Sequence, residues 1–304
     1  MLRGWDPGYI AQPLDFLGQP KNVRDLEDRL SERQASVFVE LGRNTTEWST
    51  SFIIGENRMY AEPQGQAIIV VEKNFNGTNM LLVTQKTFDQ PAGIGSGMST
   101  VIGEGLELHG SFFTRRGTRR PIHLSLLNYD FKFYGPNEFP VSDYRLHDDH
   151  WYSQWVIGGQ WTVPSGLNVL LEWTHDESGL SPAQWDELVA LTQFHANGAS
   201  LGVPSAAVSG NLAYDADTLS RNGGSMQDYL FVRFSYPLQS LEFEISSLIN
   251  TYDQSHSSGI RITYKPAQRW QTWIDMRWNQ GDTGTEFGEV PVRRDTLLAM
   301  RYFF

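Results

Sequence analysis

The sequence predicts an all-β fold in which antiparallel strands form a transmembrane β-barrel. Three observations lead to it: apolar and polar residues alternate with period two, the alternating segments are long, and the connections between them are short and long in turn. A strand places successive side chains on opposite faces, so each segment has one apolar and one polar face. In the last segment, Leu298, Met300 and Tyr302 share one face, and Asp295 and Arg301 fall on the other.

Composition narrows the classes of protein. The chain has 304 residues, net charge −11, 13% aromatic and 19% charged residues, and no cysteine. It is too aromatic and too weakly charged for a disordered chain, and its acidity argues against a nucleic-acid partner. The lack of cysteine excludes disulfides and thiolate metal sites. The longest aliphatic stretch, residues 67–71, is far shorter than the roughly 20 residues of a membrane-spanning helix, whereas a transmembrane strand is apolar on one face only.

A soluble β-sandwich is the alternative to a membrane barrel. Strands of soluble proteins commonly have about 5–6 residues, whereas a tilted strand needs about 9–11 to cross a bilayer. The segments here have the greater length. Aromatic residues also stand at strand ends on the apolar face, as in the pairs Trp155 and Trp161, and Trp270 and Trp278. This placement is typical of the aromatic girdles at the two membrane interfaces.

Thirteen strands are expected in this chain. They cover residues 35–43, 46–54, 66–74, 78–87, 94–102, 105–114, 151–163, 166–175, 227–236, 240–249, 256–265, 269–279 and 293–304. Short turns alternate with longer connections, of which 115–150 and 175–227 are the longest. Short turns on one side and long loops on the other are the pattern of outer-membrane barrels, with the long loops outside.

The N-terminal region does not fit this scheme as a strand. Residues 1–34 are expected to be an extracellular loop or N-terminal extension, ahead of a barrel domain at 35–304. Bacterial single-chain barrels have even numbers of strands, so about 13–14 strands are expected here, with one or more N-terminal strands and the export signal missing. A fourteenth strand, or a hairpin, within 119–133 is the alternative.

One short helix is expected in the long connection 175–227. Ser181 as N-cap, Pro182 at the first helical position and Gln184 two positions later form a capping box. Trp185 and Leu188 begin its apolar face. Such a helix either folds into the lumen or covers its mouth, or it is a surface helix packed on its own loop, and the sequence leaves these alternatives open.

The polar strand faces are expected to line a wet lumen. The predicted pore-lining residues are Glu107, His109, Glu172, Arg233, Glu242, Glu244, Arg261, Asp275, Arg277 and Arg301. Arginines facing carboxylates would create a transverse field that orients a polar solute. Ion pairs that fill a narrow interior are the alternative.

A basic cluster, Arg115, Arg116, Arg119 and Arg120, is predicted at the outer rim. Arginine binds phosphate bidentately, so the cluster could hold lipopolysaccharide phosphates or attract anionic solutes. A solvated run of loop charges is the alternative.

No metal, cofactor or catalytic site is predicted. The run 147–150 and the pair Asp215 and Asp217 have metal-capable side chains, but no complete calcium-binding motif follows. A hydrolase at the rim would need a nucleophile with its base in hydrogen-bond reach. His256 and Ser257 are neighbours on an extended chain and point to opposite faces, which argues against such a pair.

The end of the chain resembles the C-terminal signal of porin-like outer-membrane β-barrels of Gram-negative bacteria. That signal is a terminal Phe preceded by apolar residues at alternate positions, as in Leu298, Met300, Tyr302 and Phe304. The resemblance covers the last ten residues specifically and the strand pattern of most of the chain loosely. It implies location in a Gram-negative outer membrane, contact with its lipid and lipopolysaccharide, and insertion by the barrel-assembly machinery, with Tyr302 and Phe304 as the signal.

Taken together, these features predict a passive or gated pore for small solutes. The alternative is a non-conducting barrel that scaffolds or anchors partner proteins. A plugged lumen with paired charges would favour the scaffold. An open lumen with Arg261, Arg277 and Arg301 unpaired would favour the pore.

Overall fold

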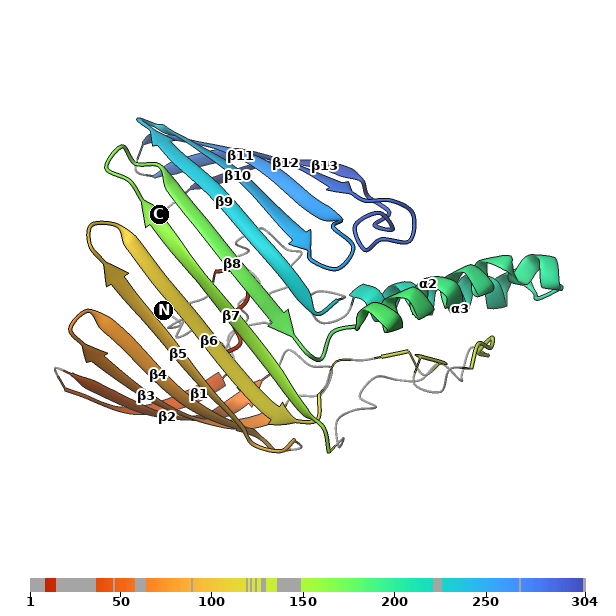
Figure 1. The fold of residues 1–304 in the computed structure, drawn as a ribbon, viewed down its shortest axis with the longest axis horizontal. Helices are drawn as coiled ribbons and strands as arrows, with labels where there is room; N and C mark the ends of the chain where they lie inside the picture. Colours follow the sequence, from red (N-terminus) through yellow and green to blue (C-terminus); the bar gives the residue numbers. More distant parts are fainter. Residues whose placement is uncertain are drawn as a thin grey trace.

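The computed structural model describes residues 9–14, 37–45, 47–57, 64–88, 90–118, 120, 122–123, 125–126, 130–135, 149–220, 226–267 and 269–302. Within these residues, thirteen antiparallel strands form one sheet, and each strand pairs with its neighbours in the sequence. Figure 1 shows this sheet curving around its concave side. Strands β1 and β13 are its two edges within the described residues.

All thirteen expected strands are present, with ends that differ from the prediction by no more than three residues. They are β1 (Val37–Asn44), β2 (Trp48–Asn57), β3 (Gln64–Phe75), β4 (Thr78–Thr87), β5 (Gly93–Ile102), β6 (Leu106–Arg116), β7 (Trp151–Thr162), β8 (Asn168–Asp176), β9 (Asp228–Leu238), β10 (Leu241–Asn250), β11 (His256–Ala267), β12 (Trp270–Gln280) and β13 (Arg294–Tyr302). The all-β prediction is confirmed.

Side-chain burial alternates along the strands as the sequence predicts. In β4, Val83 is fully buried on the concave face, while its neighbour Leu82 is 48% exposed on the convex face. The β3–β4 turn fixes this register, because Asn76 and Gly77 have φ of 48° and 81°. Positive φ at both central residues is typical of the type I′ turn of a two-residue hairpin. We call this end of the sheet the short-turn end, and the opposite end the loop end.

The convex face carries large exposed apolar side chains on every strand, which we call the outer apolar belt. It includes Val39 and Leu41 on β1, Leu108 and Phe112 on β6, Ile157 on β7, Leu171 and Trp173 on β8, and Leu298 and Met300 on β13. Aromatic rings stand near strand ends on this face, with Trp151 and Trp161 on β7 and the pair Trp270 and Tyr302 on β12 and β13, whose centroids are 4.9 Å apart. Such a surface is stable against lipid and costly against water.

Two apolar clusters fill the concave side. The first lies over β2, β3, β4 and β6, and its members are Leu14, Ile53, Ile68, Val70, Leu81, Val83 and Phe113. The second joins β8, β9 and β10 to connecting segments, and it includes Ile10, Ile122, Leu126, Leu170, Phe231, Leu248 and Phe287. The interior is therefore partly packed with chain that does not belong to the sheet.

The predicted helix is confirmed as α2 (Pro182–Ala196). Its capping box forms, because Gln184 N donates to Ser181 Oγ at 3.3 Å and Ser181 N donates to Gln184 Oε1 at 3.0 Å. A 3-10 turn η1 (Asn197–Leu201) and a second helix α3 (Ser205–Ser220) follow. The prediction of a single helix was therefore incomplete. The pair projects from the loop end, away from the sheet (Figure 1), so α2 does not enter the lumen.

The segment 119–133 holds no strand in its described part. Residues 125 and 126 are helical, and residues 130–135 belong to no ladder. The backbone of Tyr134 is instead bound by Asn211 of α3, whose Oδ1 accepts from Tyr134 N at 2.9 Å and whose Nδ2 donates to Tyr134 O at 3.1 Å. The prediction of further N-terminal strands stays a prediction.

Candidate functional site in the lumen

A buried carboxylate on β8 holds the N-terminal segment inside the curved sheet. Glu172 accepts hydrogen bonds from the backbone N–H groups of Tyr9 at 2.6 Å and Ile10 at 2.7 Å. Its Oε1 also lies 2.7 Å from Nε2 of His109 on β6. Glu172 is fully buried, and a buried carboxylate is stable only with such partners. Glu172 is therefore an anchor for residues 9–14, which we call the inner segment.

Side chains of the inner segment add to this anchor. The ring of Tyr9 stacks on Phe231 of β9 at 5.7 Å between centroids, and the guanidinium of Arg233 lies 4.2 Å from the Tyr9 centroid. A cation over an aromatic face is attracted by the ring quadrupole. Ile10 and Leu14 are fully buried in the two apolar clusters. The inner segment, red in Figure 1, thus crosses the concave side from β8 and β9 toward β2–β6.

Connecting segments close the loop end over the second cluster. Glu286, between β12 and β13, is buried and accepts from Tyr229 Oη at 2.7 Å and from Asn250 Nδ2 at 2.6 Å. Its backbone N donates to Asp253 Oδ2 at 2.7 Å. The neighbouring Phe287 packs in the cluster. These bonds fix the β12–β13 loop against β9 and β10.

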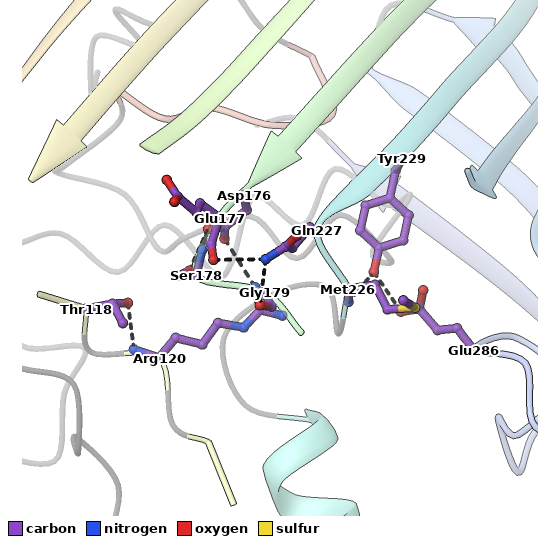
Figure 2. Close-up of polar contacts among 10 residues, drawn as sticks. All are labelled: Thr118, Arg120, Asp176, Glu177, Ser178, Gly179, Met226, Gln227, Tyr229 and Glu286. Carbon is purple, nitrogen blue, oxygen red and sulfur yellow. Dashed lines mark hydrogen bonds and ion pairs between the residues drawn. The ribbon is translucent and has the colours of Figure 1, made fainter. Parts of the chain in front are cut away.

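A second polar network lies where β8 and β9 meet the loops (Figure 2). Gln227 Nε2 donates to the carbonyl oxygens of Glu177 at 3.2 Å and Gly179 at 3.3 Å. Asp176 accepts from Ser178 Oγ at 2.5 Å and from Arg120 Nη1 at 3.2 Å. This network joins the residues just before α2 to the segment that follows β6.

The short-turn half of the lumen holds a polar cavity of about 260 Å³ over β10–β13. Its lining residues are Glu242, Glu244, Arg261, Thr263, Lys265, Gln271, Trp273 and Arg301. Two charge pairs are formed around it. Arg261 donates to Asp275 Oδ2 through Nε at 3.1 Å and Nη2 at 2.6 Å, and Lys265 Nζ donates to Glu242 Oε2 at 2.7 Å.

All ten predicted pore-lining residues lie at concave-face positions of their strands. Glu107 and His109 stand on β6, Glu172 on β8, Arg233 on β9, Glu242 and Glu244 on β10, Arg261 on β11, Asp275 and Arg277 on β12, and Arg301 on β13. The structure gathers Glu242, Glu244, Arg261 and Arg301 at one cavity. It places His109 and Glu172 at the anchor instead. A role in solute passage stays a prediction for all ten.

The basic rim residues do not form one patch in the described part of the chain. Arg115 Nη1 donates to Gln90 Oε1 at 2.8 Å, Arg116 pairs with Asp149, and Arg120 is largely buried beside Asp176. Arg119 lies outside the described residues, as does the terminal residue Phe304 of the predicted insertion signal. Tyr302 stands on the convex face against Trp270.

The residue types weighed for metal binding and catalysis have other partners where they are described. Asp215 lies between His123 and His195, and His256 Nε2 contacts Gln280 Oε1 at 2.8 Å. Residues 147 and 148 and the side chain of Asp217 lie outside the described part. Within it, no cluster of three or more metal-capable side chains has the geometry of an ion site.

The inner segment and α3 are the two elements near the candidate site that the sequence did not predict. No described helix is long and apolar enough to cross a membrane. The thirteen-stranded meander, the alternation of short turns and long loops and the outer apolar belt are together the features of outer-membrane β-barrels. The class predicted from the sequence is thus the class that the structure has.

Comparisons with known proteins add little detail. No family model and no curated protein sequence matches the chain. Among solved structures, an in-vitro folded OmpT, described as an outer membrane protein of Vibrio cholerae, has a TM-score of 0.44 and 8% identity, covering 89% of each chain. The copper transporter OprC has a TM-score of 0.33 and 8% identity, covering 77% of this chain and 43% of its own. These similarities are too low to indicate a function.

Proposed function

We propose that the chain is a gated pore for small polar solutes in the outer membrane of a Gram-negative bacterium. One observation supports this most strongly. The polar cavity in the short-turn half of the lumen gives way, toward the loop end, to a segment that belongs to no strand and is held by Glu172. The short-turn half of the lumen is polar, and at the loop end the inner segment packs together with the connecting segments of the second apolar cluster. The inner segment belongs to no ladder, so its release would widen the lumen without breaking the sheet.

The energetics of the inner segment fit a gate. Burial of each of the side chains Ile10 and Leu14 contributes about 1.5–3 kcal/mol. The two backbone hydrogen bonds to the charged Glu172 contribute about 1.5–3 kcal/mol each. On release, water replaces the backbone N–H groups as partners of the carboxylate, which offsets part of the loss. These contributions keep the inner segment bound most of the time, so openings are rare. The sheet keeps all its ladders when the segment leaves.

The second candidate function is a non-conducting barrel that scaffolds or anchors partner proteins. Two observations favour it: the apolar cluster around Ile10 and Phe287 fills the loop end, and Arg261 and Lys265 are paired with carboxylates. Both candidates share the location, and with it the proposed contacts with lipopolysaccharide and the barrel-assembly machinery. We propose no enzymatic reaction for the chain.

Recordings in planar bilayers test the pore against the scaffold. Wild-type protein is compared with Glu172→Ala, which removes the anchor, and with Glu187→Ala on α2 as the matched control. Heat-dependent mobility on gels confirms that each variant is folded. We expect brief, uniform conductance steps from the wild type and the control, and a higher open fraction in Glu172→Ala.

Silence of all three folded and inserted proteins would overturn the pore and favour the scaffold. Because Glu172→Ala alters a buried group, Leu14→Asp is the second variant. It places a charge in the first apolar cluster without touching the carboxylate, and the same rise in open fraction is expected.

A further inference from the structure

We propose that the cavity at the short-turn end is a binding subsite for short zwitterionic peptides, with the carboxylate end at Arg301 and the ammonium end at Glu244. This inference rests on the proposed pore, because it names the solutes that the lumen would select. It is carried by two lining charges of opposite sign that have no hydrogen-bonded charge partner, and by their positions in the strand register.

Arg301 is the cation available to a ligand. Its guanidinium carbon lies 5.4 Å from the ring centroid of Trp273, and no carboxylate pairs with it among the residues that the structure describes. Guanidinium groups stack on aromatic faces and keep their N–H edge for a carboxylate. Gln271 stands directly opposite Arg301 in the β12–β13 ladder and also lines the cavity. A solute carboxylate would thus meet a charged donor and an amide donor side by side.

Glu244 is the anion available to a ligand. It faces Arg261 across the β10–β11 ladder, but the Nε and Nη2 atoms of Arg261 are both directed to Asp275. Arg233 is turned to Asn168 and to the ring of Tyr9. No hydrogen bond to the Glu244 side chain occurs within the described part of the chain. An ammonium group of a solute supplies donors that this carboxylate lacks.

The remaining charges of the cavity compensate each other. Lys265 and Glu242 form a close ion pair, and Arg261 belongs to Asp275. Arg233 and Arg261 act on Glu244 only through space. Among the lining residues this leaves Arg301 and Glu244, on different strands, without a hydrogen-bonded charge partner. A small inorganic ion satisfies only one of them, whereas a zwitterion satisfies both. The cavity is therefore matched to a dipolar solute.

The register of the strands sets the length of that solute. Glu244 is level with Arg261, Asp275 and Leu297 across the ladders. Arg301 lies further along β13 by four residues, which is about 13 Å at the rise of a strand, and β10 and β13 are three spacings apart, about 14 Å. Together these two offsets place the two backbones about 19 Å apart. The side chains of Glu244 and Arg301, which both line the cavity, extend toward each other's side of it and cover part of this gap. A free amino acid is too short to bridge it, whereas an extended tripeptide spans about 10 Å.

The volume is consistent with this class. A cavity of about 260 Å³ is slightly smaller than the pockets of roughly 300–1,000 Å³ that enclose drug-sized ligands. Thr263 and Gln271 line its walls and offer groups that can bond to peptide amides. A peptide of two or three small residues fits this combination of size and polarity.

Calorimetry on the detergent-solubilised full chain tests the subsite without requiring conduction. The titrants are trialanine, free alanine, and trialanine blocked at both ends, which has the same backbone without charges. We expect saturable binding of trialanine, and binding of the other two that is weaker by about tenfold or more. Equal binding of the charged and the blocked peptide, or no binding of trialanine to folded protein, would overturn the proposal.

Two variants test whether Arg301 and Glu244 bind the charged ends of the peptide. Arg301→Gln and Glu244→Gln should each weaken trialanine binding by about tenfold. Arg294→Gln, at the loop end of β13, and Glu187→Gln, on α2, are the matched controls and should bind as the wild type does. If the controls weaken binding as much as the two cavity variants do, the assignment of the site is wrong.

Bilayer recordings on the same preparations separate the subsite from the pore. Conductance without peptide binding would support the pore and overturn the subsite. Peptide binding without conductance would support the subsite and overturn the pore. With both present, trialanine should interrupt the current, and blocked trialanine should not.

Discussion

His195 of α2 and Asp215 of α3 form a buried pair in which Nδ1 of the ring is 2.7 Å from Oδ2 of the carboxylate. Nε2 of the same ring is 3.0 Å from the carbonyl oxygen of Lys132. Both partners are acceptors, so both ring nitrogens must donate, and the ring is the charged imidazolium. The other carboxylate oxygen lies 3.3 Å from Nε2 of His123. The pair thus joins both helices to the segment after β6.

Removing the charge of Asp215 should loosen this junction. In Asp215→Asn the imidazolium of His195 loses its counter-charge while staying buried, and breaking such a pair costs about 3–5 kcal/mol. We expect the backbone amides of α3 to exchange hydrogen at least about a hundredfold faster. Hydrogen-exchange mass spectrometry measures this. Asp186→Asn, on the exposed side of α2, is the control, and equal protection of α3 in both variants would contradict the account.

The same junction should weaken as pH rises. Burial alone lowers the pKa of His195, but the hydrogen bonds to Asp215 and to the Lys132 carbonyl outweigh it and raise the pKa above its ordinary 6.5. A folded-state pKa above the unfolded value gives stability that is complete below pH 6.5 and lost as pH rises through the raised value. Burial alone raises the pKa of Asp215, but the hydrogen bond with His195 and the nearby ring of His123 outweigh it and lower the pKa, so Asp215 stays ionised throughout this range.

Exchange in α2 and α3, corrected for the intrinsic effect of pH, should therefore be faster at about pH 9 than at about pH 6. Tyr134 and Tyr214 also face His123. His195→Gln should remove the pH dependence. A dependence that persists in this variant would assign it to another group.

Trp185 connects α2 to the β12–β13 loop. Its Nε1–H donates to the carbonyl oxygen of Gly284 at 2.7 Å, and its ring is buried in the second apolar cluster. Trp185→Phe keeps an aromatic ring and removes the donor, so we expect residues 281–288 to open more easily by about 1 kcal/mol, or about fivefold in exchange rate. Unchanged exchange there would show that the hydrogen bond from Trp185 does not hold the loop.

The strands could be predicted because their signal is local. The alternation around Val83 or Leu298 is visible within ten residues, and turn residues such as Asn76 and Gly77 mark the register. Helix α2 was predictable from its capping box. Helix α3 was not, because the side that it turns inward carries Asn211 and Asp215 instead of an apolar stripe.

The inner segment could not be predicted for a different reason. Its partners Glu172 and Phe231 are far away in the sequence, and nothing local distinguishes Tyr9 and Ile10 from residues of an outer loop. Likewise, the charges of the lumen were assigned to the right face, but their pairing depends on neighbours in the ladder. Arg261 meets Asp275, while Arg301 meets Trp273.

The outer apolar belt predicts how charge is tolerated on the convex face. Ile157 lies in the middle of β7 and is 62% exposed. Ile157→Arg should destabilise the barrel in lipid vesicles by about 2–4 kcal/mol, and Trp151→Arg at the strand end by about 1 kcal/mol or less. Urea titration of the vesicle-bound protein measures both. Equal small effects would indicate that this face meets water.

Release of the inner segment can be measured in a single inserted protein by thiol modification. The chain has no cysteine, so Leu14→Cys is the single target for a charged thiol reagent added during a bilayer recording. We predict slow modification, because the site is buried until the inner segment leaves. An irreversible, stepwise rise in open fraction should follow, and the wild type should not respond. Complete modification confirmed by mass, with the current unchanged, would contradict the claim that the inner segment closes the lumen.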